Sequence, residues 1–415
     1  MVKKRYPQGF FIRCNCFGIL LLFCLLCHNN NAYGGESKFQ FYSEKICISY
    51  ADQFVLPEYE RINKENIYVA YNHLQSINTD SLIETLQNLK VKYQLDDWLF
   101  YSLIKKFTLS IDRRTEYNDL YNWFLLARCD YDVRLIYNEK GRKQVRLIIT
   151  GDVGNTDSFF MGWTLDDKLY LDINTSLKKG LRHYIDLDLK GGSKPMKFQP
   201  VQAPNLPNRE IVWEDRVLYF GKNDSLNVKL PFDLTKIQIL HDYPLVDYGD
   251  YYEIPINEEL IEIIDTILYS RFENKSEKQK LEIIYNFTIQ MFSYCDDEDL
   301  FLRREVPQSL EQAFYYNKGD CEDYTLFIFM LADRYTNFDL IAIKYMNHVT
   351  FGVGGLETRC DESFCFEHND KKYLVIEPDL FDYGRLKKTY WTKLLEVTFD
   401  ESDMMFPVEV IKSNI

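Results

Sequence analysis

The sequence Gly-Asp-Cys-Glu-Asp-Tyr at 319–324 most strongly constrains what this chain can fold into. It leads into residues 324–331, which are apolar almost all round, so this helix is expected to be buried at the centre of a domain. Alternating, strand-like stretches follow at 339–345, 348–353 and 372–377. A buried helix followed by strands that can pair antiparallel predicts an α+β domain.

Three residues in this region have the chemistry of a catalytic triad. Cys321 lies at the start of the helix, where the helix dipole favours a thiolate and free N–H groups can donate to an oxyanion. His348 opens the second strand and Glu377 ends the third, so antiparallel pairing can bring base and acid together. Asp379 is a second candidate for the acid. A cysteine alone would more often be a small core residue, so the prediction depends on all three together.

These residues resemble the core of the transglutaminase-like superfamily of papain-type cysteine enzymes. The resemblance lies in Gly-Asp-Cys at 319–321, in the histidine that opens a strand, and in Ile-Glu-Pro at 376–378. It extends over about residues 255–385, near a third of the chain. It implies a helix bearing the cysteine packed on an antiparallel sheet, with Cys321 as nucleophile and His348 as base.

The resemblance implies a third triad member and a further oxyanion donor. The family usually has aspartate before the proline, whereas this chain has Glu377, whose longer side chain changes how it can orient the histidine. Gln312 is a candidate for the oxyanion donor, and a solvated helix residue is the alternative interpretation of the same position.

Two further interpretations of function stay open beside the enzyme. An enzyme of this type forms an acyl-enzyme on a protein or peptide substrate, and resolution by water, a peptidase-like reaction, is favoured over resolution by an amine. A non-catalytic transglutaminase-like binding domain in a cell-envelope assembly is the alternative. A zinc site from Cys360, Cys365 and His368 has near-ligand spacing but lacks a fourth local ligand. The sequence therefore predicts neither a metal nor a cofactor.

The N-terminal segment 1–34 has the pattern of a secretory signal. Basic residues precede an apolar stretch at 17–27, which is shorter than the about 20 residues needed to span a bilayer. Ala-Tyr-Gly at 32–34 is a small-x-small cleavage site. An exported protein, periplasmic or at the cell surface, is therefore expected, and Cys27 is a possible lipid-attachment residue. The net charge of −14 argues against nucleic acid as a partner, because phosphate binding needs a basic face.

The mature chain divides by its hydrophobic periodicity. Residues 35–130 read as a helical region, 131–255 as β-rich, 256–400 as the transglutaminase-like domain and 401–415 as a C-terminal tail. Within the first two regions, residues 100–175 repeat the order helix, strand, strand, strand of the later core but lack its cysteine and histidine. A degenerate, non-catalytic repeat of the core is the hypothesis.

A run of acids at 296–299 precedes the core helix. Four consecutive acidic residues suggest calcium, but the alternating ligands and central glycine of an EF-hand loop are missing. A solvated acidic loop is therefore expected.

Overall fold

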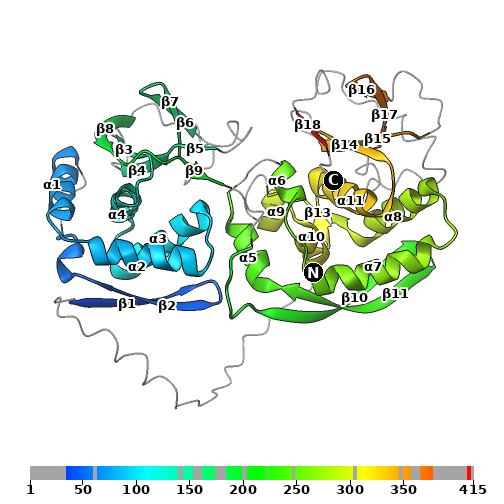
Figure 1. Cartoon of the computed structure of the whole chain (residues 1–415), viewed down its shortest axis with the longest axis horizontal. Coiled ribbons are helices and arrows are strands. Elements are labelled where there is room, and N and C mark those ends of the chain that lie inside the picture. Colours follow the sequence, from blue (N-terminus) through cyan, green and yellow to red (C-terminus); the bar gives the residue numbers. More distant parts are fainter. Residues whose placement is uncertain are drawn as a thin grey trace, which may run out of the picture.

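The structure is a computed structural model that describes residues 34–58, 63–138, 144–152, 161–172, 184–198, 203–221, 223–244, 248–301, 306–344, 349–356, 365–376 and 409–412. These residues form two lobes that lie side by side, each with helices packed on an antiparallel sheet (Figure 1). The predicted combination of helices and antiparallel strands is confirmed. The predicted signal segment lies outside the described residues up to position 33, Cys27 included.

The first lobe begins with a hairpin, continues with four helices and ends in a five-stranded sheet with order β6-β7-β4-β3-β8. A short 3₁₀ helix, η1, and a two-residue parallel pair, β5 and β9, complete it. The elements are β1 (Gly35–Phe41), β2 (Glu44–Tyr50), η1 (Asp52–Phe54), α1 (Lys64–Gln75), α2 (Asp80–Lys92), α3 (Asp97–Ile111), α4 (Thr115–Arg128), β3 (Val133–Asn138), β4 (Gln144–Ile149), β5 (Gly151–Asp152), β6 (Met161–Leu165), β7 (Lys168–Asp172), β8 (Tyr184–Lys190) and β9 (Met196–Lys197).

The second lobe has the same plan, with a hairpin, a group of helices and a five-stranded sheet of order β16-β17-β15-β14-β18. Its elements are β10 (Ile211–Gly221), β11 (Asp224–Asp233), α5 (Leu234–Asp242), α6 (Tyr248–Tyr252), α7 (Glu258–Phe272), α8 (Glu277–Met291), β12 (Ser293–Tyr294), α9 (Asp297–Phe301), α10 (Leu310–Tyr316), β13 (Lys318–Gly319), α11 (Cys321–Tyr335), β14 (Asp339–Lys344), β15 (Val349–Gly354), β16 (Cys365–His368), β17 (Lys371–Ile376) and β18 (Glu409–Lys412).

The two five-stranded sheets correspond strand for strand. In each sheet the first strand after the long helix pairs with the second strand on one side and with the last strand on the other. The helix that precedes the sheet, α4 or α11, packs against its first two strands. A shared order of this kind supports the hypothesis of a degenerate repeat. The correspondence also includes the hairpins β1–β2 and β10–β11, so it is wider than the predicted segment 100–175.

Three boundaries differ from the expected ones. The hairpin at 35–50 precedes the helices of the region predicted to be helical, and its alternating burial is that of strands. The second lobe begins with β10, before the predicted boundary at 255–256. β18 pairs with β14, so the sheet extends into residues 401–415, which were expected to form a tail. Only the third boundary depends on pairing between strands distant in sequence, which local periodicity does not report; the first two depend on hairpins.

Helix α11 occupies the centre of the second lobe. All but two of its residues from Glu322 to Tyr335 are buried, as the apolar run predicted. The ring of Phe327 lies 4.8 Å from that of Phe292, 4.9 Å from Phe314 and 6.1 Å from Phe287, measured between centroids. These contacts lock the helix between α8 and α10 and so set the place of its N-terminus.

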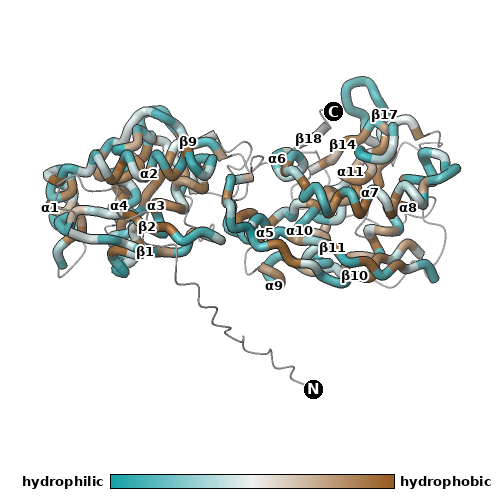
Figure 2. The backbone as a smooth tube through the Cα atoms, turned by 60° about the horizontal axis from the view of Figure 1, so that its bottom comes forward, coloured by the Kyte–Doolittle hydropathy of each residue, from teal (hydrophilic) through white to brown (hydrophobic). Residues whose placement is uncertain are grey.

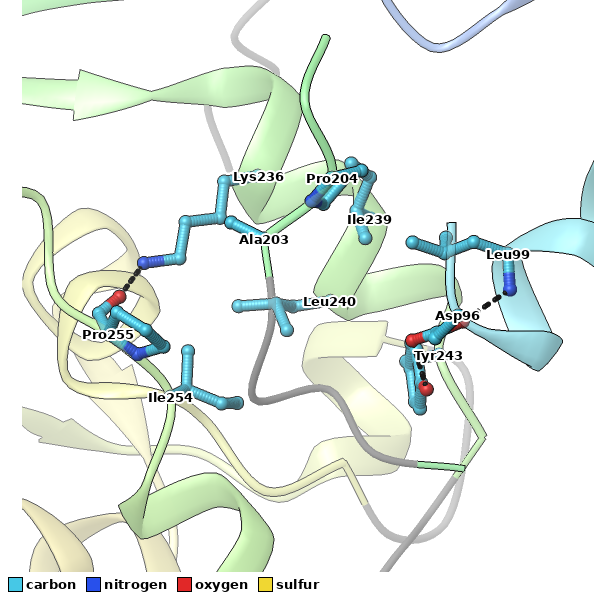
Figure 3. Close-up of a pocket in the computed structure, with 10 residues that line it drawn as sticks. All are labelled: Asp96, Leu99, Ala203, Pro204, Lys236, Ile239, Leu240, Tyr243, Ile254 and Pro255. Atoms are coloured by element: carbon cyan, nitrogen blue, oxygen red, sulfur yellow. Dashed lines mark hydrogen bonds between the residues drawn. The ribbon is translucent and has the colours of Figure 1, made fainter. Parts of the chain in front are cut away.

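A small hollow at the junction of the lobes contains a polar link between them (Figure 3). Asp96 caps α3 by accepting from the Leu99 N–H at 2.7 Å. Its other oxygen accepts from the Tyr243 hydroxyl at 2.6 Å, at the end of α5. Burial raises the pKa of Asp96 to about 6 from its ordinary 3.8. This carboxyl therefore titrates near neutral pH while it joins the two lobes.

Replacing Asp96 with asparagine is expected to weaken the pH dependence of stability. Because the folded pKa is raised, the folded chain holds this proton more tightly than the unfolded chain. Its contribution to stability is full below pH 3.8 and is lost as the pH rises through about 6. Melting temperatures measured from about pH 4 to about pH 7 should therefore fall less in Asp96→Asn than in the wild type.

The control for this prediction is Asp370→Asn, which removes an exposed carboxyl in the turn between β16 and β17. It should leave the wild-type pH dependence unchanged. Equal pH slopes in Asp96→Asn and the wild type would contradict a buried, proton-binding Asp96.

Candidate functional site

Cys321 is the first residue of α11, and Asp320 is the N-cap of that helix, as predicted. The Asp320 N–H donates to Asp323 Oδ2 at 3.3 Å, which fixes the first turn. A side chain at Gly319 would collide with the Asp323 carboxylate, so the position before the cap accepts only glycine without rearrangement. The Gly-Asp-Cys sequence is thus required by the close turn from β13 into the helix.

The sulfur of Cys321 lies against the beginning of β15. A backbone hydrogen bond from Val349 reaches the thiol, and the Thr325 hydroxyl on α11 donates to the Val349 carbonyl at 3.0 Å. Val349 directly follows His348 in the chain. The first turns of α11 are therefore tied to the start of the strand that the predicted base precedes.

The end of β17 lies next to the same part of β15. The two strands are antiparallel, as predicted, and Phe351 pairs with Ile376. The Thr350 hydroxyl donates to the Ile376 carbonyl at 2.7 Å inside the core. Ile376 is the last described residue before Glu377. The described neighbours of the predicted base and acid thus converge on the strand that contacts Cys321, whereas His348, Glu377 and Asp379 themselves lie outside the described residues.

The buried core of the first lobe extends to the residues around Cys321. Leu326 on α11 and Val349 on β15 belong to one cluster of buried residues with Tyr243, Tyr251 and Ile254 near the junction of the lobes. That cluster extends through the helices of the first lobe. The first lobe therefore packs behind the site and helps to hold its two elements.

The surroundings of Cys321 favour its protonated form. The thiol donates to Glu322 Oε2 at 3.1 Å. Burial raises the pKa of Cys321 far above its usual range, and the Glu322 and Asp320 carboxylates raise it further. The hydrogen bond from the Val349 backbone lowers the pKa of Cys321. A thiolate at this position therefore needs a base or a cation that offsets these two carboxylates.

A second group of acids lies beneath the first turn of α11. Oxygen atoms of Asp297, Asp320 and Asp323 lie within 4.8 Å of one another. Burial raises the pKa of Asp323 well above its usual range, and the neighbouring Asp320 and Asp297 add to this shift. Such a set of carboxylates is chemically able to hold a hard cation.

The expectation of a solvated acidic loop at 296–299 is wrong for Asp297. This residue is only 1% exposed and accepts a hydrogen bond from the Val306 N–H. The short helix α9 begins there and turns the Asp297 side chain inward, while Glu298 and Asp299 stay exposed. Only the fold distinguishes one acid of the run from its neighbours.

Gln312, the candidate oxyanion donor, is fully buried, so the alternative of a solvated residue is wrong. Its Oε1 accepts from the Ser309 N–H at 3.0 Å, which completes a capping box at the start of α10. Its Nε2 is buried and has no hydrogen-bond partner among the described residues. A role in oxyanion binding remains a prediction.

Gln308 is a site residue that sequence reasoning missed, as is the hydrogen bond between Glu322 and the thiol. Gln308 donates to Asp323 through its backbone N–H at 2.8 Å and through Nε2 at 2.6 Å. Glu322, adjacent to Cys321 in the chain, accepts from the thiol. The signal for Glu322 was its position in the first helical turn, but the direction of its side chain depends on packing that the sequence does not show.

The first lobe has no cysteine at the corresponding place, since α4 begins with Thr115 where α11 begins with Cys321. The zinc interpretation gains no support in the described part of the chain. Cys360 lies outside it, and a ring nitrogen of His368 lies 3.0 Å from Asn369 Nδ2 in the turn after β16.

Replacing Glu322 with glutamine is expected to speed alkylation of Cys321 at neutral pH by about tenfold or more, because each unit of thiol pKa changes the thiolate fraction tenfold. Glutamine keeps the volume of the buried side chain but removes the charge that raises the pKa of the thiol. The rate constant for iodoacetamide, followed by mass spectrometry of the peptide that contains Cys321, measures the effect.

Glu298→Gln is the matched control, because it removes the same charge from an exposed position on α9. It should leave the alkylation rate near that of the wild type. If both variants react at the same rate, Glu322 does not control the thiol.

No protein-family model matches the chain, and no curated protein is significantly similar to it in sequence. Among the described residues, no helix has the length and apolar character needed to cross a membrane. The functional argument therefore depends on the geometry around Cys321.

Proposed function

We propose that the second lobe is a transglutaminase-like cysteine enzyme of an exported protein, acting on amide bonds of a protein or peptide substrate. Cys321 is the nucleophile, His348 the base and Glu377 the orienting acid. The observation that carries the proposal is the hydrogen bond of 3.0 Å from the Thr325 hydroxyl to the Val349 carbonyl, which ties the helix that begins with Cys321 to the start of β15. It supports the triad because Val349 follows His348 and lies on the strand that pairs with the one preceding Glu377.

The proposed reaction begins with transfer of the thiol proton from Cys321 to His348. The sulfur then attacks the amide carbonyl carbon, and the N–H groups of the first turn of α11 stabilise the oxyanion. The C–N bond breaks, His348 gives its proton to the leaving amine, and a thioester remains on Cys321. Water attacks the thioester, the C–S bond breaks, and the acid and the thiol are released. An amine in place of water would give a new amide.

We favour water as the acceptor, which makes the activity peptidase-like. The signal-like N-terminal segment supports the proposal that this activity acts outside the cytoplasm, in the periplasm or at the cell surface, with a lipid on Cys27 as the proposed means of attachment.

A non-catalytic binding domain of the same fold is the second candidate function. The observation that favours it is the pair of carboxylates, Glu322 and Asp320, that raise the pKa of the Cys321 thiol. Catalysis then requires His348 to remove the proton against these charges, whereas a binding domain requires no ionised thiol.

Alkylation kinetics distinguish the two functions. The iodoacetamide rate constant of Cys321 is measured against pH in the wild type and in His348→Ala, with His368→Ala as the control for loss of a histidine in the same lobe. For an enzyme, we expect His348→Ala to slow the reaction at neutral pH by about tenfold or more, and His368→Ala to leave it unchanged. A Cys321 that reacts no faster than a model thiol and is insensitive to His348 would support the binding domain.

A further inference from the structure

One face of the hairpin β10–β11 exposes large apolar side chains. On β10, Ile211 is 41% exposed, Trp213 44%, Val217 43% and Tyr219 44%. They occupy alternate positions, so they all lie on the same side of the strand. The opposite side of β10 packs on α8. Figure 2, which turns this side of the molecule forward, shows apolar stretches along the hairpin.

The fold itself does not require this apolar face. The hairpin β1–β2 begins the first lobe as β10–β11 begins the second, and its solvent face is polar. The exposed residues there are Glu36, Lys38, Gln40, Lys45, Cys47 and Ser49. Two hairpins at corresponding places in one chain thus differ in the character of the outer face. Packing within the chain therefore does not explain why tryptophan, tyrosine and valine are exposed on β10.

The two strands of this face differ in side-chain size at three positions. Across the strands, Trp213 is opposite Pro231, Val217 is opposite Asn227, and Tyr219 is opposite Ser225. At these positions the larger side chain is on β10, and Pro231 itself is buried.

A pair of opposite charges lies in the middle of this face. Asp215 on β10 is opposite Lys229 on β11, and both are exposed. Neither forms an ion pair with another residue in the described part of the chain. The face therefore carries one positive and one negative group, side by side and open to a partner.

We propose that this face is the interface of a symmetric dimer of the chain. A two-fold axis that runs parallel to the strands, between two hairpins packed face to face, sets β10 of each copy over β11 of the other. At the three positions above, the larger side chains of each copy then lie over the smaller ones of its partner. Asp215 meets Lys229 of the partner subunit, and the same pair forms a second time by symmetry.

The alternative two-fold arrangement does not fit. An axis across the strands at the level of Asp215 sets β10 over β10, so that larger side chains oppose larger ones and Asp215 opposes its own copy. Like charges placed directly opposite each other are unfavourable. Shape and charge therefore both select the axis parallel to the strands. Tryptophan and tyrosine, both present on this face, are also among the residues that dominate binding energy at interfaces.

Sedimentation equilibrium of the full chain over a concentration series tests the proposal. The wild type is expected to dimerise, and Trp213→Asp to weaken dimerisation by about 30-fold or more, as loss of a buried tryptophan anchor does. Val69→Asp places the same charge on an exposed valine of α1 and should leave the dimer unchanged. Melting curves establish that each variant is folded.

Charge reversal tests the orientation of the two copies. Asp215→Lys and Lys229→Asp should each weaken the dimer by about tenfold or more, and the two changes together should restore it to within about threefold. A wild type that stays monomeric at every concentration overturns the proposal. So does a dimer that Trp213→Asp leaves intact, or one that Asp215→Lys strengthens.

Discussion

Replacing Cys321 with serine is expected to lower amide turnover by about 10⁴-fold or more, as loss of the nucleophile does in enzymes of this type. A serine hydroxyl has a much higher pKa than a thiol, and the acids beside position 321 would oppose its ionisation further. Serine also keeps the size and the helix-start position of the native residue, so the fold should be preserved. Release of amine from a panel of peptide amides by the full chain measures the effect.

Cys295→Ser is the matched control for this prediction. Cys295 is another unpaired cysteine of the second lobe, and its N–H donates to the Gly319 carbonyl at 2.9 Å, close to the site. It does not begin a helix and lacks the contact with β15. Its replacement should leave turnover unchanged. Turnover that survives in Cys321→Ser would assign the reaction to another group.

Replacing Phe327 with alanine is expected to lower the free energy of unfolding by about 3–5 kcal/mol. Phe327 is 1% exposed and its ring contacts three other aromatic rings, so truncation leaves a cavity between α8, α10 and α11. Urea-induced unfolding of the full chain, followed by circular dichroism, measures the change. Because the same helix places Cys321, alkylation of the thiol should also lose its dependence on His348 in this variant.

Tyr269→Ala is the control for loss of an aromatic ring. Tyr269 is 59% exposed on α7 and contacts the ring of Tyr335 at its edge. Loss of this ring should lower the free energy of unfolding by less than about 1 kcal/mol, as surface substitutions usually do. A similar cost for Phe327→Ala would mean that α11 is not the packed centre of the lobe.

Much of the second lobe was predictable from local patterns. The apolar run after position 321 predicted a buried helix, because no face of it could be left in water. The sequence Ser-Glu-Lys-Gln at 276–279 has the pattern of a capping box, and the structure has this box at the start of α8. The strands at 339–344, 349–354 and 371–376 followed from alternation. Each of these features depends on neighbours within a few residues, which a single sequence displays.

The candidate site was predictable only in outline. The sequence predicts a cysteine at a helix start, and the structure places it there. The sequence does not predict that Glu322 accepts from the thiol, that Asp297 turns inward to Asp320 and Asp323, or that Gln312 is buried. Side-chain direction in a first helical turn depends on which elements pack around it, and these come from distant parts of the chain.

By itself the sequence determined the helix α11, the strands at 339–344, 349–354 and 371–376, and the position of Cys321 at the start of a buried helix, because periodicity and capping act over a single turn or strand. Only the tertiary structure decided that Val349 contacts the thiol, that β18 completes the sheet and that the outer face of β10 is uncovered. It also decided that two sheets share one strand order. The physical reason is that strand pairing and burial join residues far apart in the chain, and no local pattern specifies which distant partner is chosen.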